Sequence, residues 1–223
     1  MYLFLKRLFD LTLSFIALFF LFSFFLIISI ILFFTGEGEV FYLQERIGYK
    51  NKKFKIIKFA TMIKNSPNIG TGSITLRDDP RVLPIGKILR KTKINELPQI
   101  FNVIIGNMSI VGPRPQMERD LDKFPKSTRN KIYLSKPGIT GIGSIIFRDE
   151  EKSISEAKGD KHKFYKNHIA PYKGKLEIWY LNNSSIIVDL IIVIITAWVI
   201  IFPKSNPIYK VFPNLPKKNI TLD

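Results

Sequence analysis

The chain of 223 residues contains no cysteine, only two histidines and few acidic residues. Without cysteine it cannot form a disulfide-stapled secreted domain or a cysteine-ligated metal site. The two histidines, His162 and His168, lie in a lysine-rich stretch without metal-ligand spacing, so we expect surface or packing roles for them. Neither a Walker A loop nor a G-x-G-x-x-G motif occurs, which excludes the usual glycine-rich nucleotide-binding loops.

The scarcity of acids leaves a strongly basic chain. Lys and Arg total 34 against 18 Asp and Glu, a formal net charge of +16, and 46% of the residues are hydrophobic. Such a chain is too apolar to be disordered. It is typical of a protein that sits at an anionic membrane or handles anionic substrates. We predict no nucleic-acid partner, because the aromatic residues gather in an apolar run rather than among the basic residues.

Residues 11–34 form an uncharged run of 24 residues that holds 8 of the 19 phenylalanines. The run is long enough for a membrane helix and too long for the apolar region of a signal peptide. Basic residues flank it on both sides, with Lys6 and Arg7 before it and seven within residues 46–64. Two arrangements stay open: a helix that spans the membrane, and a helix that enters and leaves by the same face.

A second apolar run, residues 186–202, contains Asp189 and is followed by Pro203. A carboxylate is costly in hydrocarbon, so we expect an interfacial or core-packed helix here. The chain is thus predicted to be a mostly helical α+β membrane protein in three parts: an anchoring helix at 1–36, a catalytic domain at 37–185, and an interfacial helix with a basic tail at 186–223.

The middle of the chain has local sequence patterns that predict strands, helices, turns and a loop. Alternation predicts strands at residues 40–44 and 53–62, and polar composition predicts a loop at 64–79. Helical spacing of Leu97, Ile100, Phe101 and Ile104 predicts a helix that starts at an Asn95 N-cap and stops at Gly106. We further expect non-helical turns at 111–115 and 136–144 and a helix at 171–181.

Cations crowd the sequence around the predicted helix start, where Glu96 is the one acid. Helix N-termini and arginines suit phosphate, and a carboxylate among phosphates suits magnesium. A diphosphate with magnesium is therefore one interpretation, and a solvated basic helix face is the other. The acidic cluster at residues 147–151 leaves a similar choice between a metal or loop-ordering role and a solvated turn.

Five segments, in this order, resemble the small monotopic phosphoglycosyl transferases, or bacterial sugar transferases: KFATM (58–62), DDPRVLPIGKILRKTKINELPQIFNV (78–103), GNMSIVGPRP (106–115), KPGITG (136–141) and WYLNNSSIIVDL (179–190). The resemblance runs from residue 6 to about residue 196. It implies transfer of a phosphosugar from a UDP-sugar to undecaprenyl phosphate, giving a lipid-diphosphate sugar and UMP for a surface glycan. It also implies Mg²⁺ at Glu96, and a re-entrant helix that keeps both chain ends on the cytoplasmic side of the bacterial inner membrane.

The sequence departs from the family pattern at two places. The family breaks its N-terminal helix at Ser-Pro, where this chain has Ser23-Phe24. The family's dyad is Asp-Glu, where this chain has Asn95-Glu96. A carboxamide cannot form the acyl phosphate that a nucleophilic Asp would form.

Four accounts of the altered dyad follow. Glu96 itself attacks, or the lipid phosphate attacks directly, or the chain is an impaired scaffold of glycan assembly, or another carboxylate attacks, for which Asp149, Glu150 and Glu151 are candidates. We predict Asn95 and Glu96 at the catalytic centre. The predicted phosphate contacts are Arg90, Arg114, Lys58 and Arg81, with Arg114 the strongest. The sequence leaves open whether the chain forms a homo-oligomer.

Overall fold

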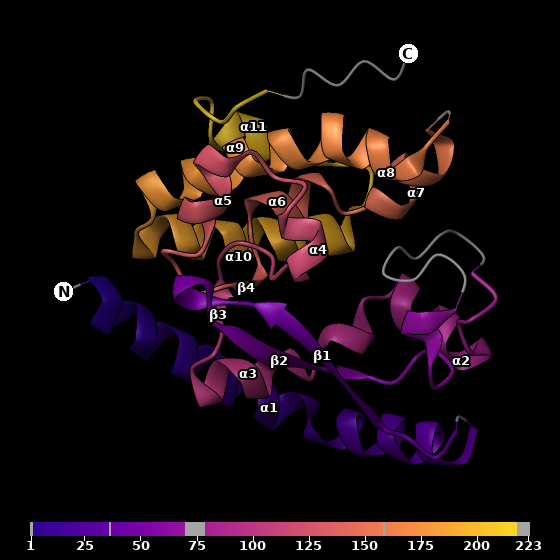
Figure 1. The fold of residues 1–223 in the computed structure, drawn as a ribbon. Coiled ribbons are helices and arrows are strands. Elements are labelled where there is room, and N and C mark those ends of the chain that lie inside the picture. The colour runs from indigo at the N-terminus through magenta and orange to yellow at the C-terminus, as the bar shows by residue number, and fades with distance from the viewer. Residues whose placement is uncertain (1, 36, 70–78, 158, 218–223) are drawn as a thin grey trace.

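The computed structural model describes residues 2–35, 37–69, 79–157 and 159–217. One long helix, α1 (Tyr2–Thr35), lies along one side of the molecule beneath a β-hairpin (Figure 1). The hairpin pairs β1 (Phe41–Ile47) antiparallel with β2 (Lys53–Phe59). Both predicted strands are therefore confirmed, with β1 extending further along the chain than expected.

The segment after the hairpin carries the candidate site. It contains helix α2 (Pro84–Lys91), the 3-10 turn η3 (Ile94–Glu96), helix α3 (Gln99–Ile105) and the short strand β3 (Ser109–Val111). The predicted stop at Gly106 is confirmed, because this residue ends α3 with φ 97°, a left-handed conformation that favours glycine.

The predicted start of this helix is wrong. Asn95 lies inside the 3-10 turn η3, whose bonds run three residues back, from Glu96 N–H to Lys93 O and from Leu97 N–H to Ile94 O. Lys93 is left-handed, with φ 61°, which separates this turn from α2. Pro98 has no N–H to continue an α-helical ladder from the turn, so α3 begins only at Gln99.

The remaining elements complete a mostly helical α+β fold. They are η1 (Tyr49–Asn51), η2 (Ser66–Asn68), α4 (Glu118–Leu121), α5 (Lys126–Ile132), β4 (Gly138–Thr140), α6 (Ile142–Ile146), α7 (Glu150–Glu156), α8 (Lys161–Phe164), the π-helical η4 (Tyr165–Ile169), α9 (Ala170–Asn183), α10 (Ile186–Ile201) and α11 (Ile208–Val211). The predicted helix at 171–181 is confirmed within α9. The predicted loop at 64–79 contains η2, and residues 70–78 of it lie outside the described residues.

The second predicted turn, at residues 136–144, instead contains β4 and the start of α6. Strand β4 pairs in parallel with β3. The pairing depends on glycine, because a Cβ on Gly138 would lie 2.1 Å from the backbone nitrogen of Gly112 and a Cβ on Gly141 would lie 2.2 Å from its carbonyl oxygen. The first predicted turn, at 111–115, is non-helical after β3, as expected.

Helices α1 and α10 each bury one face and expose an apolar one. Phe25, Ile28 and Leu32 of α1 pack in a cluster with Phe59 of β2 and Ile100 of α3. Helix α10 buries every third or fourth residue and exposes large apolar side chains between them, which confirms the core-packed alternative for this helix. Among the described residues, α1 alone is long and apolar enough to cross a membrane by length and composition.

Asp189 of α10 is completely buried where α10 meets α1. Its carboxylate accepts hydrogen bonds from Lys6 Nζ at 2.7 Å and Tyr2 Oη at 3.1 Å, both on α1, and from Tyr180 Oη at 2.7 Å. Lys6, which we treated above as a flanking membrane charge, therefore serves as an internal ion-pair partner. The three-part division of the chain stays a prediction, and both apolar helices pack against the central part.

Candidate active site

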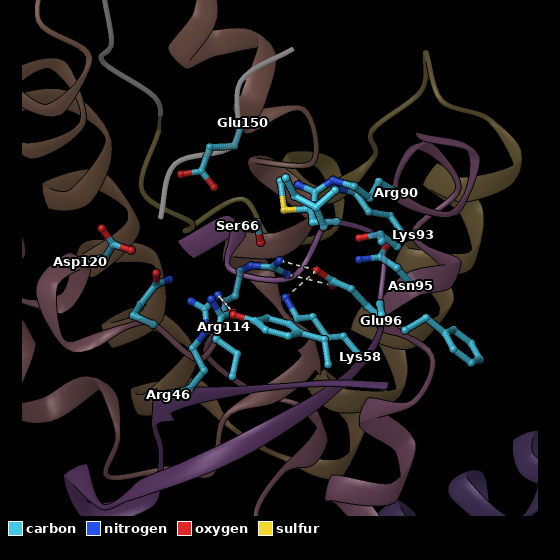
Figure 2. A pocket seen from close by; sticks show the side chains of 18 of the residues that line it. Arg46, Lys58, Ser66, Arg90, Lys93, Asn95, Glu96, Arg114, Asp120 and Glu150 are labelled. Carbon is cyan, nitrogen blue, oxygen red and sulfur yellow. Dashed lines mark hydrogen bonds and ion pairs between the residues drawn. The ribbon is translucent and has the colours of Figure 1, made fainter. Parts of the chain in front are cut away.

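A pocket of about 470 Å³ opens beside the hairpin, between η3, the loop that follows β3, and helices α4 and α7. Figure 2 shows Lys58, Glu96 and Arg114 meeting at its centre, with Asp120 on one side and Arg90 on the other. Five of the six site residues predicted above line it: Lys58, Arg90, Asn95, Glu96 and Arg114. The structure thus brings together side chains from β2, α2, η3 and the 112–117 loop.

Glu96 forms the centre of this pocket. Arg114 grips it with both terminal nitrogens, Nη2 at 2.6 Å from Oε1 and Nη1 at 3.2 Å from Oε2. Lys58 Nζ lies 3.7 Å from Oε1. Such two-pronged arginine–carboxylate pairing fixes orientation as well as distance.

The loop that carries Arg114 is held at several points. Pro113 and Pro115 flank the arginine and restrict its backbone. The carbonyl of Arg114 accepts a hydrogen bond from Tyr133 Oη at 2.8 Å, and the same hydroxyl accepts one from the N–H of Gln116 at 2.8 Å. The arginine therefore enters the pocket from a stiff support.

Arg46 is a pocket residue that the sequence analysis missed. It projects from β1 toward Arg114 and is held by Gln44 Oε1, with its Nη2 at 2.5 Å, and by the Pro115 carbonyl at 3.3 Å. The available signal was strand alternation, which places Gln44 and Arg46 on one face of β1. Lys93 and Arg119 also line the pocket.

The charges at the centre alter one another's protonation. Burial alone would raise the pKa of Glu96, but Arg114 and Lys58 outweigh it and hold that pKa well below its usual range. Burial lowers the pKa of Lys58 to about 7, with Arg46 and Arg114 adding to the shift and Glu96 opposing it. Burial and the neighbouring Arg114 likewise lower the pKa of Arg46 to about 10. Eight basic and four acidic side chains line the pocket, so its lining carries more positive than negative charge.

Asn95 is buried at the edge of this group, and its Oδ1 has no hydrogen-bond partner among the described residues. A buried amide oxygen without a partner is costly. The position therefore supplies an oxygen that can bind a ligand.

Arg81 is not brought to the pocket. Its guanidinium is buried and bonds to Asp79 at 2.6 and 2.8 Å and to the carbonyls of Ser66 and Ile69 at 2.8 Å each. Through these bonds, Arg81 connects η2 and the residue after it to the segment that precedes α2. We therefore assign Arg81 a structural role in place of the phosphate contact expected from the sequence.

The acidic cluster before α7 is divided by the fold. Glu150 lines the pocket and pairs with Lys173 at 2.6 Å, whereas Asp149 precedes α7 and does not line the pocket; the side chain of Glu151 lies outside the described residues. His162 Nδ1 lies 3.3 Å from Lys123 Nζ and His168 stacks on Phe164, and both histidines are exposed, in line with the expected surface or packing roles. No group of three or more His, Asp or Glu side chains that could hold a metal occurs in the part of the chain that the structure describes.

The profile of the family described as "Bacterial sugar transferase" matches residues 1–203. The chain belongs to this family. The sugar transferase is accordingly an enzyme of the phosphoglycosyl transferase class.

Three relatives are similar to this sugar transferase over most of its length. "Exopolysaccharide production protein ExoY" of Sinorhizobium fredii is 34% identical over 203 residues, which cover 84% of this chain and 81% of the relative. "UDP-N-acetylgalactosamine-undecaprenyl-phosphate N-acetylgalactosaminephosphotransferase" of Aeromonas hydrophila is 31% identical, over 86% of this chain and 42% of the relative. "Undecaprenyl-phosphate galactose phosphotransferase" of Salmonella typhimurium is 28% identical, over 74% and 34%. The sugar transferase thus spans less than half the length of the last two.

Proposed function

We propose that this sugar transferase moves a phosphosugar from a UDP-sugar to undecaprenyl phosphate, releasing UMP and initiating a surface polysaccharide. The observation that carries the proposal is the charge of the pocket. Glu96 lies beside Arg114 and Lys58, and eight basic side chains line the pocket against four acidic ones, Glu39, Glu96, Asp120 and Glu150. Such a surplus of cations suits a donor diphosphate together with an acceptor phosphate. The names of the relatives above supply the donor and acceptor classes.

We propose a direct displacement for the chemical step. An oxygen of the lipid phosphate forms a new bond to the sugar-bearing phosphorus, the bond from that phosphorus to the UMP oxygen breaks, and UMP leaves with the electron pair. Arg114, Lys58 and Arg46 stabilise the phosphoryl charge during transfer. Both oxygens of Glu96 are bonded by Arg114, which makes this carboxylate a weak nucleophile, and Asn95 has a carboxamide in place of one.

We further propose that magnesium binds at Glu96 and Asn95. Magnesium takes oxygen ligands, usually one or two carboxylates together with substrate phosphates. The carboxylate of Glu96 and the unpartnered Oδ1 of Asn95 belong to adjacent residues at the pocket wall and fit this preference. When bound, the ion would supply Lewis-acid stabilisation of phosphate oxygens.

We place the protein on the cytoplasmic face of the bacterial inner membrane, with α1 entering and leaving by that face. The exposed apolar side chains of α1 and α10 support membrane contact. The first half of α1 is bonded to α10 and β3, and its second half packs against β2 and α3. Contacts of both halves of α1 with one domain support this placement.

The test is UMP release by the purified protein with undecaprenyl phosphate, Mg²⁺ and a panel of UDP-sugars. We expect lipid-dependent release by the native chain, loss in Glu96→Gln, and no phosphosugar adduct by intact mass. An adduct in the native chain would overturn direct displacement while leaving the reaction standing. No release from the native chain, but release from Asn95→Asp, would overturn the activity and identify a scaffold that lacks its nucleophile.

A further inference from the structure

The first turns of α1 send three polar side chains to three different elements. Lys6 bonds to α10, as described above. Arg7 reaches the end of α3, and Asp10 reaches β3. Polar groups on a long apolar helix are costly unless they are paired, so each contact indicates a fixed position of the helix against the domain.

Arg7 holds the far end of α3. Its Nη1 donates to the carbonyl of Val103 at 2.6 Å and its Nη2 to the carbonyl of Ile104 at 2.8 Å. Both carbonyls lie in the last turn of α3, where the helix ladder leaves acceptors open and the backbone is partly negative. The same helix begins at Gln99, directly after the Glu96-Leu97-Pro98 segment, so the position of Glu96 depends on how α3 is held.

Asp10 holds the start of β3. Only 2% of Asp10 is exposed, and its Oδ1 accepts hydrogen bonds from Ser109 Oγ at 2.9 Å and from the N–H of Ile110 at 3.0 Å. Arg114 follows Ile110 by four residues. Gly112 lies between them, and a Cβ there would lie 2.3 Å from the carbonyl oxygen of Lys136. Because the backbone is packed this tightly, a shift of β3 moves the Arg114 loop with it.

Helix α3, the turn after it and strand β3 form one helix–turn–strand unit, residues 99–111. Glu96 lies just before this unit and Arg114 just after it, and α1 bonds to the unit on both sides of its turn. We propose that Arg7 and Asp10 are positioning residues, which set the Glu96–Arg114 geometry from the membrane helix. The inference rests on the proposed function only in that Glu96 and Arg114 act on the substrate. It makes α1 a part of the active-site support as well as an anchor.

The experiment compares Asp10→Ala with Asp10→Asn in the full chain in bilayer nanodiscs. The carboxamide keeps an acceptor for Ser109 and Ile110, and alanine removes it. We expect kcat in Asp10→Ala to fall about tenfold to a hundredfold with little change in the KM for UDP-sugar, since small displacements at a reacting centre carry losses of this order. Hydrogen exchange at residues 109–114 should rise in the same variant, and Asp10→Asn should restore both readouts.

Tyr2→Phe is the matched control, because it removes one hydrogen bond between α1 and α10 without touching the helix–turn–strand unit. Unchanged exchange or unchanged kcat in Asp10→Ala would overturn the proposal. So would an equal fall of kcat in Tyr2→Phe, because any loosening of α1 would then suffice. Hydrogen exchange needs no turnover, so an inactive native chain defeats the proposed function while the positioning role is still decided by exchange.

Discussion

Two of the buried ion clusters in the described residues, at Asp189 and at Glu96, are built differently. At Asp189, one carboxylate meets one cation, Lys6, and two hydroxyl donors. At Glu96, one carboxylate meets Arg114 and Lys58, and Arg46, held by Gln44, lines the same pocket. In the first cluster one cation meets one carboxylate, whereas the pocket around the second is lined by eight basic and four acidic side chains. Surplus charge, rather than burial, therefore distinguishes the site from the structural cluster.

The largest effect is expected from Glu96→Gln, which removes the carboxylate of the unbalanced cluster. We expect kcat/KM for UDP-sugar to fall by about 10³-fold, the size found for loss of a key electrostatic group. UMP release measures this. If Asp189→Asn reduced kcat/KM per folded molecule by the same factor, the distinction between the two clusters would fail.

The next effect is on stability, at the balanced cluster. Lys6→Met leaves the Asp189 charge buried without its cation, and we expect the free energy of unfolding to drop by about 3–5 kcal/mol. The double variant Lys6→Met, Asp189→Leu removes both charges and should recover much of that loss. Denaturant unfolding in nanodiscs checks both, and equal instability of the single and double variants would contradict the balanced-pair interpretation.

Arg114→Lys tests whether the site needs only the positive charge of Arg114 or also its two hydrogen bonds to Glu96. A lysine keeps the charge and loses the two-pronged grip on Glu96, so we expect kcat/KM to fall about 10²-fold. Arg129→Lys on α5 is the control, since Arg129 pairs with Asp122 away from the pocket, and its kinetics should match the native chain. An unaffected Arg114→Lys would mean that the pocket needs only charge.

The smallest effect concerns pH. The pKa of Lys58 falls from 10.5 to about 7 on folding, so the folded protein binds fewer protons than the unfolded chain between these values. Stability from this group therefore rises with pH across that window. A bound diphosphate favours the charged amine, so UDP-sugar binding should take up a proton and weaken by up to about tenfold per pH unit above 7.

Calorimetry in buffers of different ionisation enthalpy measures the proton uptake. Lys58→Arg stays charged over the same range and should bind with a flat pH dependence. The same slope in both proteins would assign the proton to another group.

Local pattern predicted more of the fold than of the site. The hairpin strands, α3 with its Gly106 stop, and α9 follow from alternation and helical spacing, because each depends on neighbours in sequence. The predicted start of α3 was wrong because Lys93 adopts a left-handed backbone conformation, which the spacing of apolar residues does not reveal. The prediction of a turn where β4 lies was wrong, because the glycines of this segment allow a close contact with Gly112, which is distant in the sequence.

At the site, residue types and the family resemblance together predicted Lys58, Arg90, Glu96 and Arg114 but could not rank them against Arg81. That arginine resembles a phosphate ligand in sequence and bonds instead to Asp79, two residues before it. Arg46 escaped notice because nothing local links it to Arg114. Lys6 was read as a topological charge because its partner lies 183 residues away.

That separation has a consequence for how the protein is made. Lys6 is synthesised 183 residues before Asp189. In the proposed membrane placement, α1 reaches the bilayer while its lysine is still without its carboxylate, next to anionic headgroups that can bind it, because domains form progressively during translation. We expect Asp189 to replace this lipid when α10 packs against α1, and chains truncated before residue 189 to stay membrane-bound without the Lys6–Asp189 ion pair.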